Sequence, residues 1–211
     1  ENVIIGGADL NVPIFDEDAF GLELFGDIVL QKLGMGSMVG LGGKIANTIL
    51  YRAELRILGE SFIPVYFDRL YDLYRVRRYS VYSGSVSKAP YWGWLGSLGF
   101  SFFDDSIVFN TEVEGPFNPS SSENFKVKSS LDIGPVLIPG VSLNLFYQKE
   151  NIDQIEDLIS PEEALMGGKI SYRTGPALLS FFYTLQYDPF AASGENPWEV
   201  SSGLESSITL F

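Results

Sequence analysis

The strongest constraint on the fold is a two-residue alternation of apolar and polar side chains that recurs along the chain. It is clearest in TGPALLSFFYTLQYDPF, residues 174–190. One face of a strand there carries Leu179, Phe181, Tyr183, Leu185 and Tyr187, and the other carries Leu178, Ser180, Phe182, Thr184 and Gln186. The alternation lasts for about ten residues, longer than most soluble strands and long enough to cross a bilayer when tilted.

Similar alternation predicts about twelve antiparallel strands over the whole chain. It is weak in the Gly-rich third strand, and its phase is ambiguous in the fifth. The expected strands lie within residues 3–14, 20–31, 37–45, 49–57, 75–82, 91–103, 107–115, 125–133, 141–149, 164–173, 174–190 and 199–211.

The connections between the later strands alternate between short and long. The short ones are Asp104-Asp105, residues 134–140 and Thr174-Gly175-Pro176, and the long ones are residues 116–124, 150–163 and 188–198. An up-and-down transmembrane barrel has this rhythm, whereas a Greek-key sandwich has no reason to keep it. The sequence therefore predicts an all-β fold, a single antiparallel transmembrane β-barrel domain over residues 1–211. We expect it to be a mature form or the C-terminal part of a longer envelope protein.

Composition narrows the functional classes. The 211 residues include no cysteine and no histidine, which removes disulfides, thiolate metal sites and the usual Ser–His and Cys–His nucleophile pairs. The formal net charge of -13 argues against a nucleic-acid partner, because phosphate binding needs a basic face. Hydrophobic residues make up 45% of the chain, yet no apolar run is long enough for a transmembrane helix. The apolar residues are therefore spread by alternation, as in a sandwich core or a membrane barrel.

In this pattern and in its final Phe211, the chain resembles bacterial outer-membrane β-barrels of the porin and small-channel class. At the alternate positions before it, Glu205, Ser207 and Thr209 are polar where the usual C-terminal assembly signal is apolar. The resemblance implies a passive pore for small solutes or ions, or the membrane anchor of a larger envelope protein. Its implied partners are outer-membrane lipid, and further copies or a larger envelope assembly. The enzymatic members of this class use histidine-containing sites, so we expect no enzymatic activity, cofactor or metal.

Charged residues on the polar faces of the predicted strands are the candidates for lining a pore. In a barrel they would project into the lumen, where rings of charge set ion selectivity. The alternative is a mutually neutralising network that only stabilises the wall. The candidate pore-lining residues are Glu23, Asp27, Arg52, Glu54, Arg56, Lys126, Lys128, Asp132, Lys169 and Arg173.

Residues 62–79 are the least strand-like part of the chain. Phe67, Leu70, Tyr71 and Tyr74 have helical spacing, which predicts a short amphipathic helix followed by a basic cluster. We expect this segment to narrow the mouth of the barrel; the alternatives are a cap outside the lumen or an ordinary strand. The candidate constriction residues are Asp68, Arg69, Asp72, Arg75, Arg77 and Arg78.

The acidic connection 150–163 is expected to be a solvated surface loop. Within it, Ser160, Pro161 and Glu163 are typical of a helix start, with Ser160 as the N-cap. The carboxylates lack the spacing of an EF-hand loop, so no defined calcium site is predicted.

The alternative to a membrane barrel is a soluble β-sandwich or barrel that binds a sugar or a lipid. The two readings assign different roles to the aromatic residues near strand ends. In a membrane barrel these residues form girdles at the interface, and in a soluble module they are core or ligand-stacking positions. They are Trp92, Trp94, Tyr147, Tyr172, Tyr187 and Trp198.

Overall fold

The computed structural model describes residues 3–17, 19–64, 71–118, 124–162, 164–187 and 196–208, without the side chains of residues 71–74. Within these ranges the chain forms one sheet of eleven strands, one α-helix and a short 3-10 helix. The strands are β1 (Gly6–Glu17), β2 (Phe20–Leu30), β3 (Met35–Ile45), β4 (Ile49–Leu58), β5 (Tyr91–Phe102), β6 (Ile107–Pro116), β7 (Phe125–Ile133), β8 (Val141–Ile152), β9 (Ala164–Thr174), β10 (Ala177–Tyr187) and β11 (Trp198–Ile208). The helices are α1 (Tyr71–Ser83) and η1 (Ile155–Ile159).

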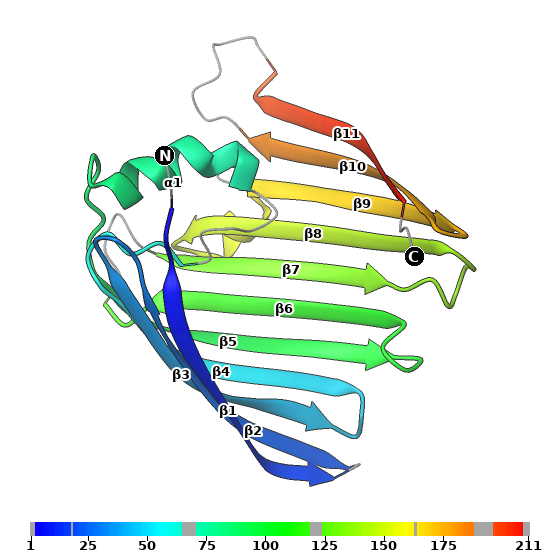
Figure 1. Ribbon diagram of the computed structural model, residues 1–211, viewed down its shortest axis with the longest axis horizontal. Coiled ribbons are helices and arrows are strands. Elements are labelled where there is room, and N and C mark those ends of the chain that lie inside the picture. The colour runs from blue at the N-terminus through cyan, green and yellow to red at the C-terminus, as the bar shows by residue number, and fades with distance from the viewer. Residues whose placement is uncertain are drawn as a thin grey trace.

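Each strand pairs antiparallel with the strand that follows it, so the order in the sheet is the order in the chain. The sheet curves into an open trough (Figure 1). Among the described residues, β1 pairs only with β2 and β11 pairs only with β10, which leaves two free edges. The predicted all-β, antiparallel, up-and-down architecture is confirmed, whereas the sheet itself is not closed.

The predicted strand within residues 75–82 is wrong, because these residues belong to α1. The described part of the chain therefore has eleven strands rather than about twelve. The physical reason is packing at helical spacing: Tyr79 and Tyr82 lie three residues apart, and their ring centroids are 6.2 Å apart. A short run of alternating arginines and aromatics fits both periods, and tertiary contacts decide between them.

The two ends of the trough carry different connections. At one end, here named the tight-turn end, the connections join β1 to β2, β3 to β4, β5 to β6, β7 to β8 and β9 to β10. At the other, here named the loop end, they join β2 to β3, β4 to β5, β6 to β7, β8 to β9 and β10 to β11. The alternation of short and long connections predicted for the second half is confirmed. At the loop end, residues 31–34 are the short exception.

Helix α1 lies at the loop end, beside the start of β1 (Figure 1). Its Tyr82 packs with Ile63 in a small buried cluster that Val3, Ile5, Tyr79 and Val81 surround. The Tyr82 hydroxyl accepts a hydrogen bond of 2.9 Å from the backbone N–H of Ile4. The cluster fixes α1 to residues 3–5. None of the described helices has both the length and the apolar character needed to cross a membrane.

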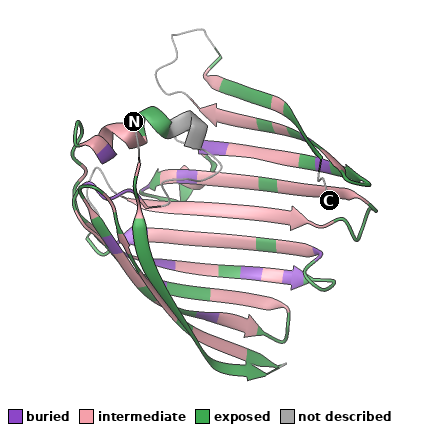
Figure 2. Cartoon of the chain, in the orientation of Figure 1, coloured by how far each residue is buried: buried purple, intermediate pink, exposed green. Residues whose placement is uncertain are grey.

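The alternation gives the sheet two chemically different faces. Polar side chains from β1 to β7 converge on one depression, so the polar face is the concave one. β1 is exposed along its whole length, whereas β7 is half-buried throughout (Figure 2). Large apolar side chains are exposed on the convex face. Among them are Leu24, Ile28, Val39, Leu55, Ile57, Leu98, Leu145, Ile170, Phe181 and Leu204.

Candidate functional site: the polar concave face

A chain of ion pairs begins at the middle of β4. The Glu54 side chain is fully buried and lies between two arginines of its own strand. Its Oε1 contacts Arg52 Nε, and its Oε2 accepts a hydrogen bond of 2.6 Å from Arg56 Nε. Residues two apart in a strand point to the same side, so this arginine–glutamate–arginine spacing brings all three together on the concave face.

The same network crosses β5 to reach β6 and β7. Arg56 Nη1 donates to Glu114 Oε2 at 2.6 Å, and Lys128 Nζ lies 3.4 Å from Glu114 Oε1. Gly93, the β5 residue directly opposite Arg56, has no side chain to block the contact. Arginine offers several donors in a fixed fork, which lets Arg56 bind two carboxylates at once.

Smaller polar pairs continue across the rest of the concave face. Their polar atoms lie 2.5–3.6 Å apart. The pairs are Asn11–Glu23 at 2.9 Å, Ser97–Asn110 at 2.8 Å, Asp132–Asn144 at 2.6 Å, Lys126–Glu150 at 3.6 Å, Lys169–Glu205 at 2.5 Å and Ser171–Ser180 at 2.8 Å.

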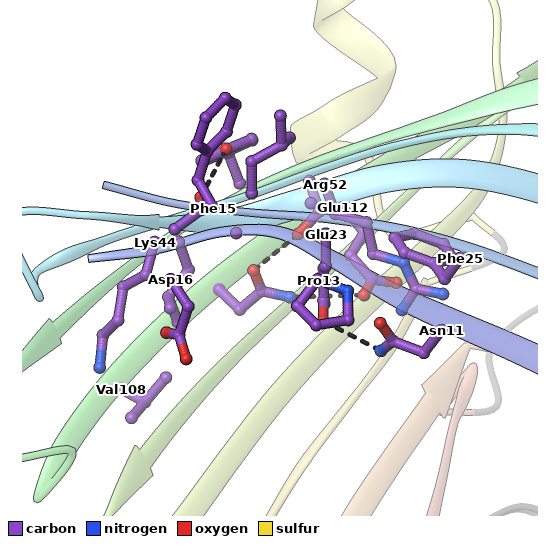
Figure 3. Close-up of a pocket in the computed structure, with 18 of the residues that line it drawn as sticks. Asn11, Pro13, Phe15, Asp16, Glu23, Phe25, Lys44, Arg52, Val108 and Glu112 are labelled. Carbon is purple, nitrogen blue, oxygen red and sulfur yellow. Dashed lines mark hydrogen bonds between the residues drawn. The ribbon is translucent and has the colours of Figure 1, made fainter. Parts of the chain in front are cut away.

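A depression of about 870 Å³ lies on this face toward the tight-turn end. In the close-up, Asn11 reaches Glu23, and Arg52 lies beside Phe25 (Figure 3). The Arg52 guanidinium carbon is 4.8 Å from the centre of the Phe25 ring, a cation–π distance. Carboxylates outnumber cations among the charged residues of the lining, which are Asp16, Glu23, Lys44, Arg52, Glu112 and Asp132.

The rim of the depression is held by an acidic turn residue. Asp105, between β5 and β6, accepts a hydrogen bond from the Ser101 hydroxyl and one of 3.0 Å from Lys44 Nζ. The Ser101 hydrogen bond, and then that of Lys44, hold the pKa of Asp105 below its ordinary value of 3.8. The contact ties β3 to the β5–β6 turn, across β4.

Glycines make room for large side chains that point into the trough. A Cβ at Gly40 would lie 2.6 Å from the Phe25 ring, and one at Gly167 would lie 2.8 Å from the Phe146 ring. The Phe182 ring likewise fills the space beside Gly203. The concave face is therefore partly filled by aromatic rings rather than lined only by small polar groups.

All ten predicted pore-lining residues fall in the concave phase of their strands. Arg52, Glu54, Arg56 and Lys128 belong to the central network. Each of four others pairs with a separate neighbour: Glu23, Lys126, Asp132 and Lys169. Asp27 lies opposite Asp9 and Met38, and Arg173 lies exposed near the tight-turn end. The structure thus brings together only part of the predicted set.

The predicted constriction residues are spread over α1 and the segment before it. Asp68 and Arg69 lie outside the described residues, and so does the side chain of Asp72. Arg75 and Arg77 are exposed on α1, and Arg78 is half-buried. The predicted helix is confirmed where it overlaps the start of α1, but the basic cluster lies within α1 rather than after it, because the helix continues to Ser83. Whether the segment narrows a pore stays a prediction.

Sequence reasoning missed several acidic partners in these networks. Glu114 joins Arg56 to Lys128, Glu150 pairs with Lys126, and Glu205 pairs with Lys169. Glu114 and Glu205 lie on predicted polar faces, so strand pairing was the signal that could have found them. Glu150 falls in the predicted loop 150–163, and this prediction is wrong for Glu150 because β8 continues to Ile152.

The expected helix start at Ser160 is wrong. Ser160 ends the 3-10 helix η1, and its backbone N–H donates to the Asp157 carbonyl. Its hydroxyl accepts a hydrogen bond from Lys149 Nζ instead of capping a following helix. No group of three or more carboxylates in the described ranges has the arrangement to hold a metal ion.

Comparison with known proteins adds no family or relative to these observations. No protein-family model matches the chain, and no curated protein matches it in sequence.

Proposed function

We propose that the chain forms the wall of a bacterial outer-membrane β-barrel, a passive pore that lets small solutes or ions pass along its polar concave face. One observation carries the proposal: the convex face exposes large apolar side chains from strands across the sheet, and aromatic rings lie at both of its ends. Monomeric soluble proteins rarely expose apolar patches of more than a few hundred Å², and larger ones mark membrane or partner contacts.

At the loop end of the convex face, three aromatic pairs follow the strand ends. Their ring centroids are 4.9–6.1 Å apart. The pairs are Trp92–Phe117, Trp94–Phe125 and Tyr187–Trp198. Tryptophan and tyrosine favour the membrane–water interface, because one part of each ring system is apolar and another can form hydrogen bonds.

At the tight-turn end, Phe20 lies between two other rings. Its centroid is 6.2 Å from that of Phe15 and 6.3 Å from that of Tyr51. The strands between the two aromatic groups are 9–12 residues long, the length of a tilted transmembrane strand. An apolar band with aromatic residues on both sides is the lipid-facing pattern of membrane barrels.

The open edges set a condition on this proposal. Within hydrocarbon, an unpaired strand edge leaves backbone N–H and C=O groups without partners, at several kcal/mol for each. A functional barrel must therefore pair both β1 and β11. If the wall is closed but its lumen is blocked by the aromatic rings and ion pairs, the same structure acts as a membrane anchor.

Two experiments test the proposal in sequence. The purified protein should need detergent and should migrate differently on a gel before and after boiling; a monodisperse protein without detergent would indicate a soluble sugar- or lipid-binding module. The folded protein should then give discrete conductance steps in a planar lipid bilayer. A flat trace from protein that passes the first test removes the pore and leaves the anchor.

A further inference from the structure

The connection between β8 and β9, residues 153–162 and here named the β8–β9 loop, folds back over the convex side of the sheet. Tyr147 donates a hydrogen bond of 2.7 Å from its hydroxyl to the Leu158 carbonyl. Lys149 reaches the loop two residues further along β8. Both side chains share the phase of Leu145, which is exposed on the convex face. The loop is therefore held on the side that carries the apolar band.

Lys149 is the latch of this contact, by which we mean the side chain whose hydrogen bonds hold the loop against β8. It is only 2% exposed, although it occupies an apolar phase of its strand. Its ammonium donates to the Ser160 carbonyl at 3.2 Å, to the Ser160 hydroxyl at 2.9 Å and to the Glu162 carbonyl. A buried lysine is tolerated only with such partners, so the ordered loop and the buried ammonium require each other.

The loop is also braced from within. Asp157 Oδ2 accepts hydrogen bonds of 2.9 Å from the backbone N–H groups of Asp153 and Gln154. These two bonds, that of Gln154 first, hold the pKa of Asp157 below its ordinary value of 3.8. This bracing leaves Ile155 81% exposed and Ile159 90% exposed.

We propose that the β8–β9 loop rests in the membrane–water interface, with Ile155 and Ile159 inserted at the boundary between lipid headgroups and acyl chains. The proposal rests on the proposed membrane location of the convex face. A lipid surface is the occupant because Tyr147 holds the loop on the convex side and the two isoleucines of that loop are almost fully exposed. The carboxylates of Asp153 and Glu156 limit the depth, because a charge is costly in hydrocarbon.

Spin labels on single cysteines test this placement. The chain has no cysteine, so each introduced thiol is labelled without background. The full chain is reconstituted in phosphatidylcholine vesicles, and label depth is measured by collision with oxygen and with a water-soluble nickel chelate. Labels at Ile155→Cys and Ile159→Cys should lie about 5–10 Å into the headgroup–acyl boundary. A label at Val76→Cys, equally apolar and 74% exposed on α1 at the same end, should remain in water.

A label at Leu179→Cys on the convex face separates the two proposals. If that label lies in lipid and those at positions 155 and 159 lie in water, the loop inference fails and the membrane proposal stands. If the Leu179→Cys label is itself in water, both fail. If the Val76→Cys label lies as deep as the loop labels, the selective placement of the loop is overturned.

The role of the latch is tested by removing the hydrogen bonds that hold the loop. In the Lys149→Met background, both loop labels should move into water while the Leu179→Cys label keeps its depth. Tyr147→Phe, which removes only the hydrogen bond to Leu158, is the milder second variant and should give a smaller shift in the same direction. If the loop labels keep their depth in both variants, Lys149 and Tyr147 do not hold the loop in place.

Discussion

Phe181 and Phe182 are neighbours on β10, yet they meet opposite surroundings. Phe181 points to the convex side, is 45% exposed and faces Ile170 and Leu204 on the adjacent strands. Phe182 points into the trough and fills the space beside Gly203. On the convex face, side chains such as Phe181 contact the surrounding medium. On the concave face, rings such as Phe182 pack against neighbouring side chains and beside glycines. The two faces should therefore respond to different kinds of substitution.

A charge on the convex face should have the largest effect. Phe181→Arg is expected to destabilise the protein in lipid vesicles by about 2–4 kcal/mol, the cost of a cation near the middle of a bilayer. Urea unfolding in vesicles measures it. The matched control is Thr184→Arg on the concave side of the same strand, which should change stability little. Equal losses in both variants would show that lipid contact is not what distinguishes the faces.

Removing the buried carboxylate of the concave network should have the next largest effect. Glu54→Gln leaves Arg52 and Arg56 without their shared anion, and we expect a loss of about 1.5–3 kcal/mol in the free energy of unfolding. Lys169→Gln is the control, because that ion pair is 43% and 58% exposed and should contribute about 0–1 kcal/mol. If the two variants lose the same stability, burial of Glu54 does not strengthen the network.

Added volume should matter at Gly40 on the concave face and not at Gly96 on the convex face. A methyl group at Gly40 would lie 2.6 Å from the Phe25 ring and 2.7 Å from the Ala53 carbonyl oxygen. Gly40→Ala should therefore cost about 1–3 kcal/mol, as overpacking does. Gly96→Ala, where the nearest atom is 3.8 Å away on Trp94, should be neutral or slightly stabilising. Thermal unfolding of both variants gives the comparison, and a neutral Gly40→Ala would contradict it.

The smallest expected effect is pH-dependent and lies at the rim. Because the pKa of Asp105 is lowered in the folded state, its ionised form stabilises the fold at pH above 3.8, and this contribution is lost as the pH falls through the folded pKa. Asp105 is 63% exposed, so we expect less than about 1 kcal/mol.

The unfolding free energies of the parent and of Asp105→Asn should differ near pH 5, and the difference should shrink as the pH falls below 3.8. Ser101→Ala should reduce the difference, because it removes the first of the two hydrogen bonds. A difference in unfolding free energy between parent and Asp105→Asn that grows as the pH falls would show that the ionised Asp105 does not stabilise the fold.

Much of the sheet follows from local pattern, because alternation is a property of each strand alone. β10 and β7 need no tertiary information, and all ten lining candidates fall on the polar face for that reason. The partners could not be predicted in the same way. The Arg56–Glu114 contact joins residues 58 apart in sequence and crosses a strand, so it depends on register.

Two other features depend on tertiary context. The sequence of α1 fits a strand or a helix, and the packing of Tyr82 against Ile63 selects the helix. Lys149 falls in the apolar phase of β8, where sequence alone indicates no partner. Its surroundings arise only when residues 160 and 162 fold back over it. Where the partners of a side chain come from a segment later in the chain, alternation within its own strand does not predict them.

The free edges of the trough have a consequence for what can complete it. Each strand reverses the direction of the one before, and the number of strands in the described ranges is odd, so β1 and β11 run the same way. Joining them directly would create one parallel seam in an otherwise antiparallel wall. A second copy in the same membrane orientation presents edges of that same direction. A single strand running the opposite way would pair antiparallel with both edges and would make the count even, as in single-chain bacterial barrels.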